Sequence, residues 1–177
     1  MTSNVINQVK FRFNRSKAIE SILYLAERIS GPEIYDICKL LYFVDKTSLG
    51  RYGRFVFGES YCAMRRGATP SNAYDILKKA RQEVIDGISV NGTLVIALRS
   101  ANQKVFSKSD LECLNHVIAE YGKVSYKKRG QDAHDDAWQE AWERRGERGS
   151  AIMPVENIAK LFADSDDLLG YLHNSDS

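Results

Sequence analysis

Apolar residues recur at helical spacing through most of the chain. From about Ser16 to Ile29 they occupy one face, which predicts a first helix. A second helix, opening near Glu33, has a wider apolar face, and we expect it to be central and well buried. Ser30 and Glu33 have capping-box spacing and predict its start, while Gly31 predicts the end of the first helix. The apolar positions of the two helices are Ile19, Ile22, Leu23, Ala26 and Ile29, then Ile34, Ile37, Leu40, Leu41 and Val44.

The pattern changes between Gly50 and Pro70. Glycines and alternating residues there predict a loop and a short strand from Tyr61 to Arg65. A third helix is expected from about Ser71 to Gly87. Asn91-Gly92 then predicts a type I′ hairpin turn, since both positions of that turn need positive φ, and Thr93 to Leu98 is expected to be a buried strand. The inward positions of the third helix are Ala73, Leu77, Ala80 and Val84.

The second half of the chain also reads as helical. Ser109 and Glu112 have capping-box spacing at the start of a helix that Gly122 closes. Trp138 and Trp142 lie four positions apart on another helix, where their rings can stack on one face.

The last elements complete a fold class. Pro154 is placed to open a helix, because proline is tolerated in the first turn, and Asp166 to His173 predicts a short final helix. The elements together predict an α+β, predominantly helical fold, a single compact domain of about six to eight helices with a small antiparallel β element. The domain is expected to span residues 1–163, and residues 164–177 to form an acidic C-terminal segment that contains the short helix.

The composition is that of a globular protein with reduced thiols. The 177 residues suffice for one domain, and 44% hydrophobic with 27% charged residues is ordinary for such a domain. Cys38, Cys62 and Cys113 are odd in number and widely spaced, which argues against a disulfide framework or a zinc knuckle. No apolar run has the length of a signal peptide or a membrane span. We therefore expect a cytoplasmic protein with no membrane partner.

Charge is low overall but uneven along the chain. The formal net charge of +2 argues against strong nucleic-acid binding. The start is basic and the end acidic, with no lysine or arginine after Lys160. Such asymmetry marks a solvated face or a docking surface. The residues concerned are Lys10, Arg12, Arg15 and Lys17 at the start, and Asp164, Asp166, Asp167 and Asp176 at the end.

His134 stands among Asp132, Asp135 and Asp136, which are donors that a metal site could use. Residues so close in sequence rarely converge on one ion, so a capping or packing role is the favoured interpretation.

Other reactive residues lack partners in the sequence. His116 and Glu120 share a helical face, but the zinc helix motif needs a second histidine four residues on, so a surface pair is favoured. Cys38 has no recognisable base and is interpreted as a buried, inert thiol. Phosphate-loop, dinucleotide, Ser-His-Asp and paired-carboxylate signatures are absent. We therefore predict no enzymatic activity, no metal and no cofactor.

Four arginines gather with aromatic residues between positions 51 and 66. Such a composition suits nucleic acid, through stacking and phosphate contacts. It equally suits a protein interface, where arginine and tyrosine anchor binding. A third interpretation is a structured loop whose arginines pair with acids on neighbouring helices. The low net charge favours protein over nucleic acid as a partner. The residues are Arg51, Arg54, Arg65 and Arg66, with Tyr52, Phe55 and Tyr61.

Five short motifs follow one another between about Ile19 and Phe162. They are Lys39-Leu40-Leu41-Tyr42-Phe43-Val44-Asp45; Arg51-Tyr52-Gly53-Arg54 followed by Gly58-Glu59-Ser60-Tyr61; Ala63 and Met64 with Gly67 and Pro70; Ser109 to Leu114; and His134 with Trp138. In this order the chain resembles the Panacea domain family of SocA-like antitoxins, which are often labelled phage-associated proteins. Phe55 stands where the family usually has proline, and Ala133 where it usually has threonine. Gly67-Ala68-Thr69-Pro70 departs from the family's usual turn.

The resemblance implies an antitoxin that neutralises a partner toxin, encoded beside it, by direct protein–protein binding. Some members act as adaptors that hand the toxin to a protease, and some carry an extra DNA-binding domain. The first predicted helix begins so early that we expect no room for such a domain at the N-terminus.

The expected partner is therefore a cognate toxin protein, with a protease as a further candidate. The class of toxin and the oligomeric state stay open. Two alternatives are a phage-associated nucleic-acid-binding protein and a metal-dependent hydrolase built on His134 and its neighbouring aspartates. The residues expected to contact the partner are Tyr52, Arg54, Tyr61, Arg65, Arg66, His134 and Trp138.

Overall fold

The computed structural model describes residues 8–175, which form eight α-helices, five short strands and two 3-10 turns. The helices are α1 (Arg15–Arg28), α2 (Ile34–Tyr52), α3 (Ser71–Lys79), α4 (Lys108–Tyr121), α5 (Tyr126–Asp132), α6 (Asp136–Glu143), α7 (Val155–Ala159) and α8 (Ser165–Ser175). The strands are β1 (Tyr61–Met64), β2 (Gly67–Pro70), β3 (Ile88–Asn91), β4 (Leu94–Ala97) and β5 (Ala151–Ile152), and the 3-10 turns are η1 (Gln103–Val105) and η2 (Gly146–Arg148). The predicted class, α+β and predominantly helical, is confirmed.

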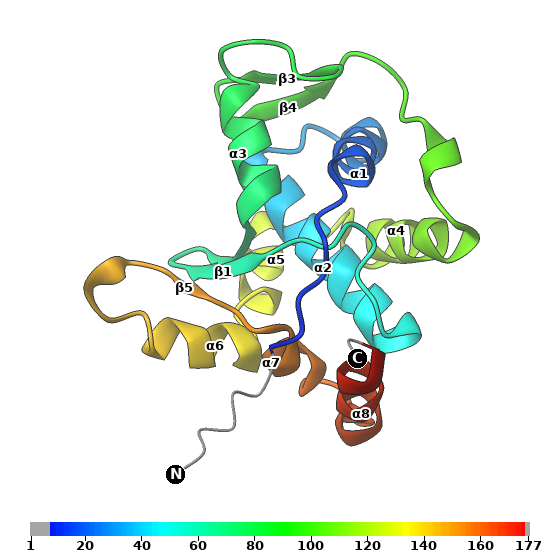
Figure 1. The fold of residues 1–177 in the computed structure, drawn as a ribbon. Coiled ribbons are helices and arrows are strands. Elements are labelled where there is room, and N and C mark those ends of the chain that lie inside the picture. The colour runs from blue at the N-terminus through cyan, green and yellow to red at the C-terminus, as the bar shows by residue number, and fades with distance from the viewer. Residues whose placement is uncertain (1–7, 176–177) are drawn as a thin grey trace.

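Helix α2 is the central element, as its wide apolar face predicted. It runs through the middle of the molecule, and α1, α3, α4, α5 and α7 all pack against it (Figure 1). All five apolar positions predicted to face the core, from Ile34 to Val44, are fully buried. None of the helices in residues 8–175 is long and apolar enough to cross a membrane.

Two small antiparallel sheets flank the helices. The first has the strand order β2-β1-β5, and the second is the β3–β4 hairpin at one end of the molecule (Figure 1). In the first sheet, Met64 pairs with Gly67, so the β1–β2 connection is a tight turn made by Arg65 and Arg66. The predicted strand from Tyr61 is confirmed, whereas β2 and β5 were not predicted.

Two corrections concern the third helix and the hairpin. Helix α3 ends at Lys79 rather than near Gly87, because the chain turns there to reach β3, and Val84 is 58% exposed. In the hairpin, Asn91 pairs with Leu94, so the loop residues are Gly92 and Thr93. Gly92 has positive φ (64°) in the first loop position, which is the type II′ pattern rather than type I′.

The predicted strand at Thr93 to Leu98 is only half buried. Val95 is 3% exposed, but Leu94 and Leu98 are 38% and 56% exposed. A two-stranded sheet packs only one face on the core, which leaves its other face to solvent.

Both predicted capping boxes are displaced from their sequence matches. For α2 the box is made by Glu33 and Asp36, because Glu33 forms a β-bridge with Leu94 and the helix can begin only after it. For α4 it is made by Ser107 and Asp110. In both cases an aspartate takes the place of the glutamate in the usual motif, and both aspartates are buried.

A buried acidic residue from the loop before β1 caps α3. The carboxylate of Glu59 accepts the backbone N–H groups of Asn72 (3.1 Å) and Ala73 (2.9 Å), since the N-cap Pro70 has no side-chain acceptor. Gly58 has φ of 64°, and a Cβ there would lie 2.1 Å from the carbonyl oxygen of Arg12. Glycine at position 58 therefore leaves room for the backbone of the segment before α1, and Glu59 caps the N-terminus of α3.

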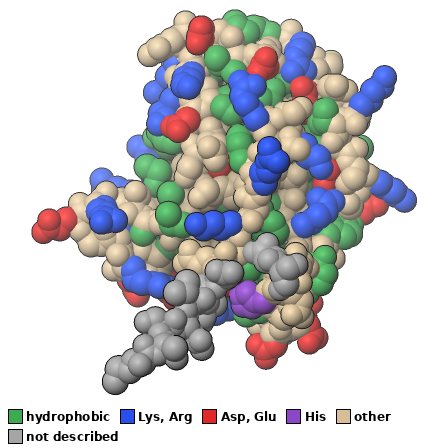
Figure 2. Space-filling view, in the orientation of Figure 1, with side chains coloured by type: hydrophobic (Ala, Val, Ile, Leu, Met, Phe, Trp, Pro, Cys, Tyr) green, Lys and Arg blue, Asp and Glu red, His purple; other side chains and the backbone are tan. Residues whose placement is uncertain are grey.

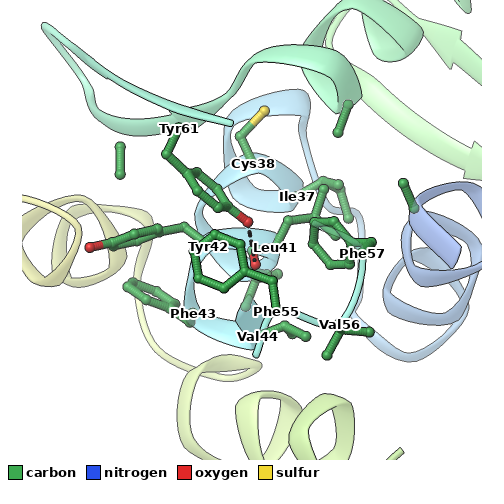
Figure 3. Packing of buried hydrophobic residues seen from close by; sticks show 14 of the residues in the cluster. Ile37, Cys38, Leu41, Tyr42, Phe43, Val44, Phe55, Val56, Phe57 and Tyr61 are labelled. Carbon is green, nitrogen blue, oxygen red and sulfur yellow. Dashed lines mark hydrogen bonds between the residues drawn. The ribbon is translucent and has the colours of Figure 1, made fainter. Parts of the chain in front are cut away.

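Buried side chains of α2, β1 and the segment before β1 pack together in the core (Figure 3). The hydroxyl of Tyr61 lies 3.1 Å from the carbonyl oxygen of Leu41 and 3.0 Å from Asp45 Oδ2. The Tyr42 ring packs edge-on against Tyr61 at 5.1 Å, but its hydroxyl points the other way, toward α5 and α6 (Figure 3).

The C-terminal helix belongs to the same core. Leu168 and Leu172 of α8 are buried, and Tyr171 lies over Gly53 at the end of α2. Acidic side chains lie on the molecular surface over α8, while lysines and arginines are spread over the upper part of this face (Figure 2). The acidic residues Asp164, Asp166 and Asp167 are exposed.

Candidate functional site

A hollow rich in positive charge lies between α2, the β1–β2 turn and α5. It encloses about 280 Å³. Five of its lining residues are cationic at neutral pH and one is a carboxylate. We call it the cationic pocket. Its lining residues are Asp36, Lys39, Arg65, Arg66, Tyr126, Lys127, Arg129, Gly130, Gln131 and His134.

The tight turn between β1 and β2 places Arg65 and Arg66 at the pocket, and both are exposed. Gly67, the next residue, has φ of 106°. A Cβ at this position would lie 3.2 Å from Ala133 Cβ and 3.3 Å from Lys39 Cε. Glycine therefore allows the turn to close against both the end of α5 and the lysine of α2.

Lys39 brings a buried ammonium group to the pocket wall. The residue is 3% exposed, and its Nζ donates a hydrogen bond of 2.9 Å to the carbonyl oxygen of Ala68. Burial, with a smaller effect from the nearby positive charge of Arg66, lowers the pKa of Lys39 to about 8. Within the part of the chain that the structure describes, no carboxylate is bonded to this buried lysine.

The single carboxylate of the pocket is already neutralised. Arg129 Nη2 donates to Asp36 Oδ1 at 2.7 Å, and Nη1 donates to the carbonyl oxygen of Tyr121 at 3.0 Å. Asp36 also accepts the backbone N–H of Glu33 as part of the capping box. Arg129 Nε is buried and has no hydrogen-bond partner among residues 8–175. Asp36 therefore balances Arg129 and leaves the other positive charges of the pocket unbalanced.

His134 joins the β1–β2 turn to the end of α5. Its two ring nitrogens lie 2.6 Å from the carbonyl oxygen of Gly130 and 3.2 Å from that of Arg65. The ring also meets the Trp138 ring edge-on at 4.2 Å. These contacts give His134 the packing role that the sequence favoured.

Two of the three aspartates around His134 are engaged elsewhere. Asp135 caps α6 through the Trp138 backbone N–H and also bonds Tyr42 (2.7 Å) and Lys46 (2.8 Å). Asp132 pairs with Lys128. Within residues 8–175 no three His, Cys, Asp or Glu side chains gather as a metal site would require. Within residues 8–175, the side chains around His134 therefore do not supply the set of metal ligands that the hypothesis of a metal-dependent hydrolase requires.

The predicted stacking of Trp138 and Trp142 is confirmed. Their rings are 5.3 Å apart and inclined by 15°, and Arg145 lies over Trp142. Trp138 is 7% exposed and donates its indole N–H to the carbonyl oxygen of Met64 at 2.9 Å. Trp138 therefore supports β1, the strand that leads into the turn formed by Arg65 and Arg66, and little of its surface is left for a partner.

The structure divides the residues predicted to contact a partner. Arg65, Arg66 and His134 come together at the cationic pocket. Tyr61 is a core residue, 1% exposed, and offers no surface to a partner.

Tyr52 and Arg54 lie apart from the pocket. Tyr52 is 37% exposed and donates its hydroxyl to Glu112. Arg54 binds the buried Asp110 at 2.8 Å and Ser109 at 2.7 Å, as the interpretation of a structured loop anticipated.

The pocket residues that were not predicted as site residues from the sequence include Lys39, Tyr126, Lys127 and Arg129. Two signals pointed to them. Lys39 interrupts the apolar face of the central helix, and Tyr126 opens a run of three basic residues. Neither signal shows that the two segments meet. Cys38, beside Lys39, is fully buried, and burial raises the pKa of its thiol to about 12, which agrees with an inert thiol.

We expect Lys39→Met to remove a pH-dependent part of the stability. The pKa of Lys39 is about 8 in the folded chain and near the usual 10.5 in the unfolded chain. Between these pH values the unfolded chain binds more protons, so the wild type gains stability as pH rises and the variant does not. Urea unfolding of both proteins at about pH 7 and about pH 10 should show that the free energy of unfolding rises more in the wild type than in the variant. An identical pH response in the two proteins would contradict a buried ammonium. Lys79→Met, at an exposed lysine, is the control.

Comparison with known protein families gives a match over much of the chain. The family model of the antitoxin SocA-like Panacea domain matches residues 37–139, more than half of the 177 residues, from the first turn of α2 into α6. The matched region contains Lys39, the turn formed by Arg65 and Arg66, helix α5 and His134. No curated protein and no solved structure matches the chain.

Proposed function

Because the chain belongs to the family of SocA-like antitoxins with a Panacea domain, we propose that it neutralises a cognate toxin by direct protein–protein contact in the cytoplasm. Membership of an antitoxin family is the observation that carries this proposal. It favours a binding role over a catalytic one.

We place the toxin contact on the rim of the cationic pocket. Arg65, Arg66, Tyr126, Lys127 and His134 are all exposed there. Arginine and tyrosine are the residues that most often dominate the binding free energy of an interface. The excess of positive charge favours an acidic surface on the toxin, which would also speed association.

The proposal predicts that reversing two charges of the rim abolishes protection. The chain is co-expressed with the neighbouring gene, and growth and co-purification are both scored. We expect the wild type to rescue growth and to form a complex, and the double variant Arg65→Glu, Arg66→Glu to do neither while keeping its thermal unfolding midpoint. The matched control is Lys79→Glu with Lys104→Glu, which makes the same charge change on α3 and η1, away from the pocket.

Each other outcome has a definite meaning. Unimpaired rescue by the double variant would move the interface away from the pocket. Rescue by the wild type without a stable complex, together with loss of the toxin from the cell, would replace sequestration by delivery to a protease. A neighbouring gene that is not toxic would overturn the proposal.

A further inference from the structure

The cationic pocket has a charge that residues 8–175 do not balance. Arg129 has its partner in Asp36, at 2.7 Å. Lys39, Arg65, Arg66 and Lys127 form no ion pair with any residue in that part of the chain. Elsewhere in the fold, partly exposed cations do have acidic partners. Those cations are Lys17 and Arg54 on Asp110, Lys46 on Asp135 and Arg99 on Glu20.

Lys39 makes this imbalance costly. A buried charge is normally paired, because its desolvation is otherwise uncompensated. Lys39 is 3% exposed and donates to a neutral carbonyl oxygen, that of Ala68. An ammonium group has three N–H donors, so two remain beyond the bond to Ala68. The nearby Arg66 repels the same ammonium. A bound anion would supply the missing countercharge to both side chains.

The size and walls of the hollow indicate what kind of anion would fit. Its volume of about 280 Å³ exceeds that of a single small ion. Carbon atoms make up most of its exposed wall, and Tyr126, a residue that is 48% exposed, is one of its lining residues. A phosphoryl group carries about two negative charges at neutral pH and several acceptor oxygens, more than a carboxylate. Arginine binds phosphate through two parallel hydrogen bonds, whereas lysine interacts with it as a point charge.

We propose that the cationic pocket binds a small phosphorylated molecule, with its phosphoryl group held by Lys39, Arg66 and Lys127 and its organic part against Tyr126. This site goes beyond the toxin contact and can be tested on the isolated chain, so its failure leaves the proposed function standing, and the converse also holds.

Calorimetric titration of the purified chain at constant ionic strength tests the site. The probes are inorganic phosphate, pyrophosphate and AMP, with sodium chloride as the reference salt. We expect saturable binding of at least one probe at millimolar concentration or below. Tighter binding of AMP than of phosphate would show that the organic part contributes, and tighter binding of pyrophosphate alone would assign the affinity to charge.

Variants locate the binding. Arg66→Gln and Lys127→Gln each remove one exposed charge and should each weaken binding about tenfold, the loss expected for one charge-assisted hydrogen bond. Lys39→Met should weaken it at least as much. Lys79→Gln, an exposed lysine of α3 outside the pocket, should leave it unchanged. No saturable binding of any probe, or equal losses in Lys79→Gln and the pocket variants, overturns the proposal. The two exposed-residue variants decide the matter even if Lys39→Met unfolds.

Discussion

Replacing Asp45 with alanine should lower the free energy of unfolding by about 3 kcal/mol or more. Asp45 is fully buried in α2, and its Oδ1 accepts the backbone N–H groups of Val56 (2.7 Å) and Phe57 (3.3 Å). Its Oδ2 lies 3.0 Å from the hydroxyl of Tyr61. Alanine leaves two buried N–H groups without acceptors, and each such group costs about 1–3 kcal/mol.

The asparagine variant distinguishes hydrogen bonding from charge at the same position. Burial raises the pKa of Asp45 to about 8 from its usual 3.8, against the opposing effect of its hydrogen bonds. The neutral acid can donate from Oδ2 to Tyr61, whose own hydroxyl then donates to Leu41 O at 3.1 Å. Asparagine reproduces this network, because its amide group donates where the acid does.

Stability should therefore fall with pH in the wild type and not in Asp45→Asn. Between pH 3.8 and about pH 8 the folded wild type holds a proton on Asp45 that the unfolded chain has released. Its stability thus decreases as pH rises through this window. Urea unfolding across this window should show that the free energy of unfolding of Asp45→Asn rises relative to that of the wild type as pH increases. Near pH 5, Asp45→Ala should be less stable than both. A constant difference between wild type and Asp45→Asn would show that Asp45 is ionised throughout.

Replacing Asp110 with alanine should cost about 3–5 kcal/mol, because it breaks a buried ion-pair network that joins three segments. The Asp110 side chain has no exposed surface, and it binds Lys17 of α1 at 2.6 Å and Arg54, after α2, at 2.8 Å. It also accepts the backbone N–H of Ser107 at 2.9 Å as the second half of the α4 capping box. The variant loses the acceptor for the Ser107 N–H, which is one half of the capping box, and leaves Lys17 and Arg54 without their shared carboxylate.

The acid side of the stability curve checks the same network. Burial alone would raise the pKa of Asp110, but the hydrogen bonds from Lys17, the Ser107 amide and Arg54 outweigh it and hold the pKa below 3.8. Its stabilising effect is thus present above pH 3.8 and is lost as pH falls through the lower folded pKa.

Thermal and urea unfolding of Asp110→Ala and the wild type should therefore converge in strong acid. The control is Asp75→Ala, which breaks an exposed pair with Lys78 and should change stability by no more than about 0.5 kcal/mol. Equal effects of the two substitutions would show that the network does not stabilise the fold.

Local physical rules determined the elements that were predicted correctly. The spacing of apolar residues identifies α1, α2 and the start of α3 because a helix repeats within a few residues. The stacking of Trp138 and Trp142 follows from the same geometry. The family was recognisable for a related reason, since its motifs are short and their order along the chain survives without knowledge of the fold.

The predictions that failed depended on contacts between distant segments. Both capping boxes shifted because partners elsewhere, Leu94 in one case and Lys17 with Arg54 in the other, act on the residues that start the helices. Tyr61 looked like an interface anchor in the sequence and is a core residue in the fold, since only the packing of β1 on α2 decides which way its ring points.

The sequence by itself determined the fold class, the central helix and the family, because these follow from local periodicity and short motifs. Only the tertiary structure decided the cationic pocket. Its charges come from α2, the β1–β2 turn and α5, segments separated by tens of residues, and each is unremarkable alone. The packing of those three elements sets their mutual distances and leaves, among residues 8–175, only Asp36 to balance them, through Arg129.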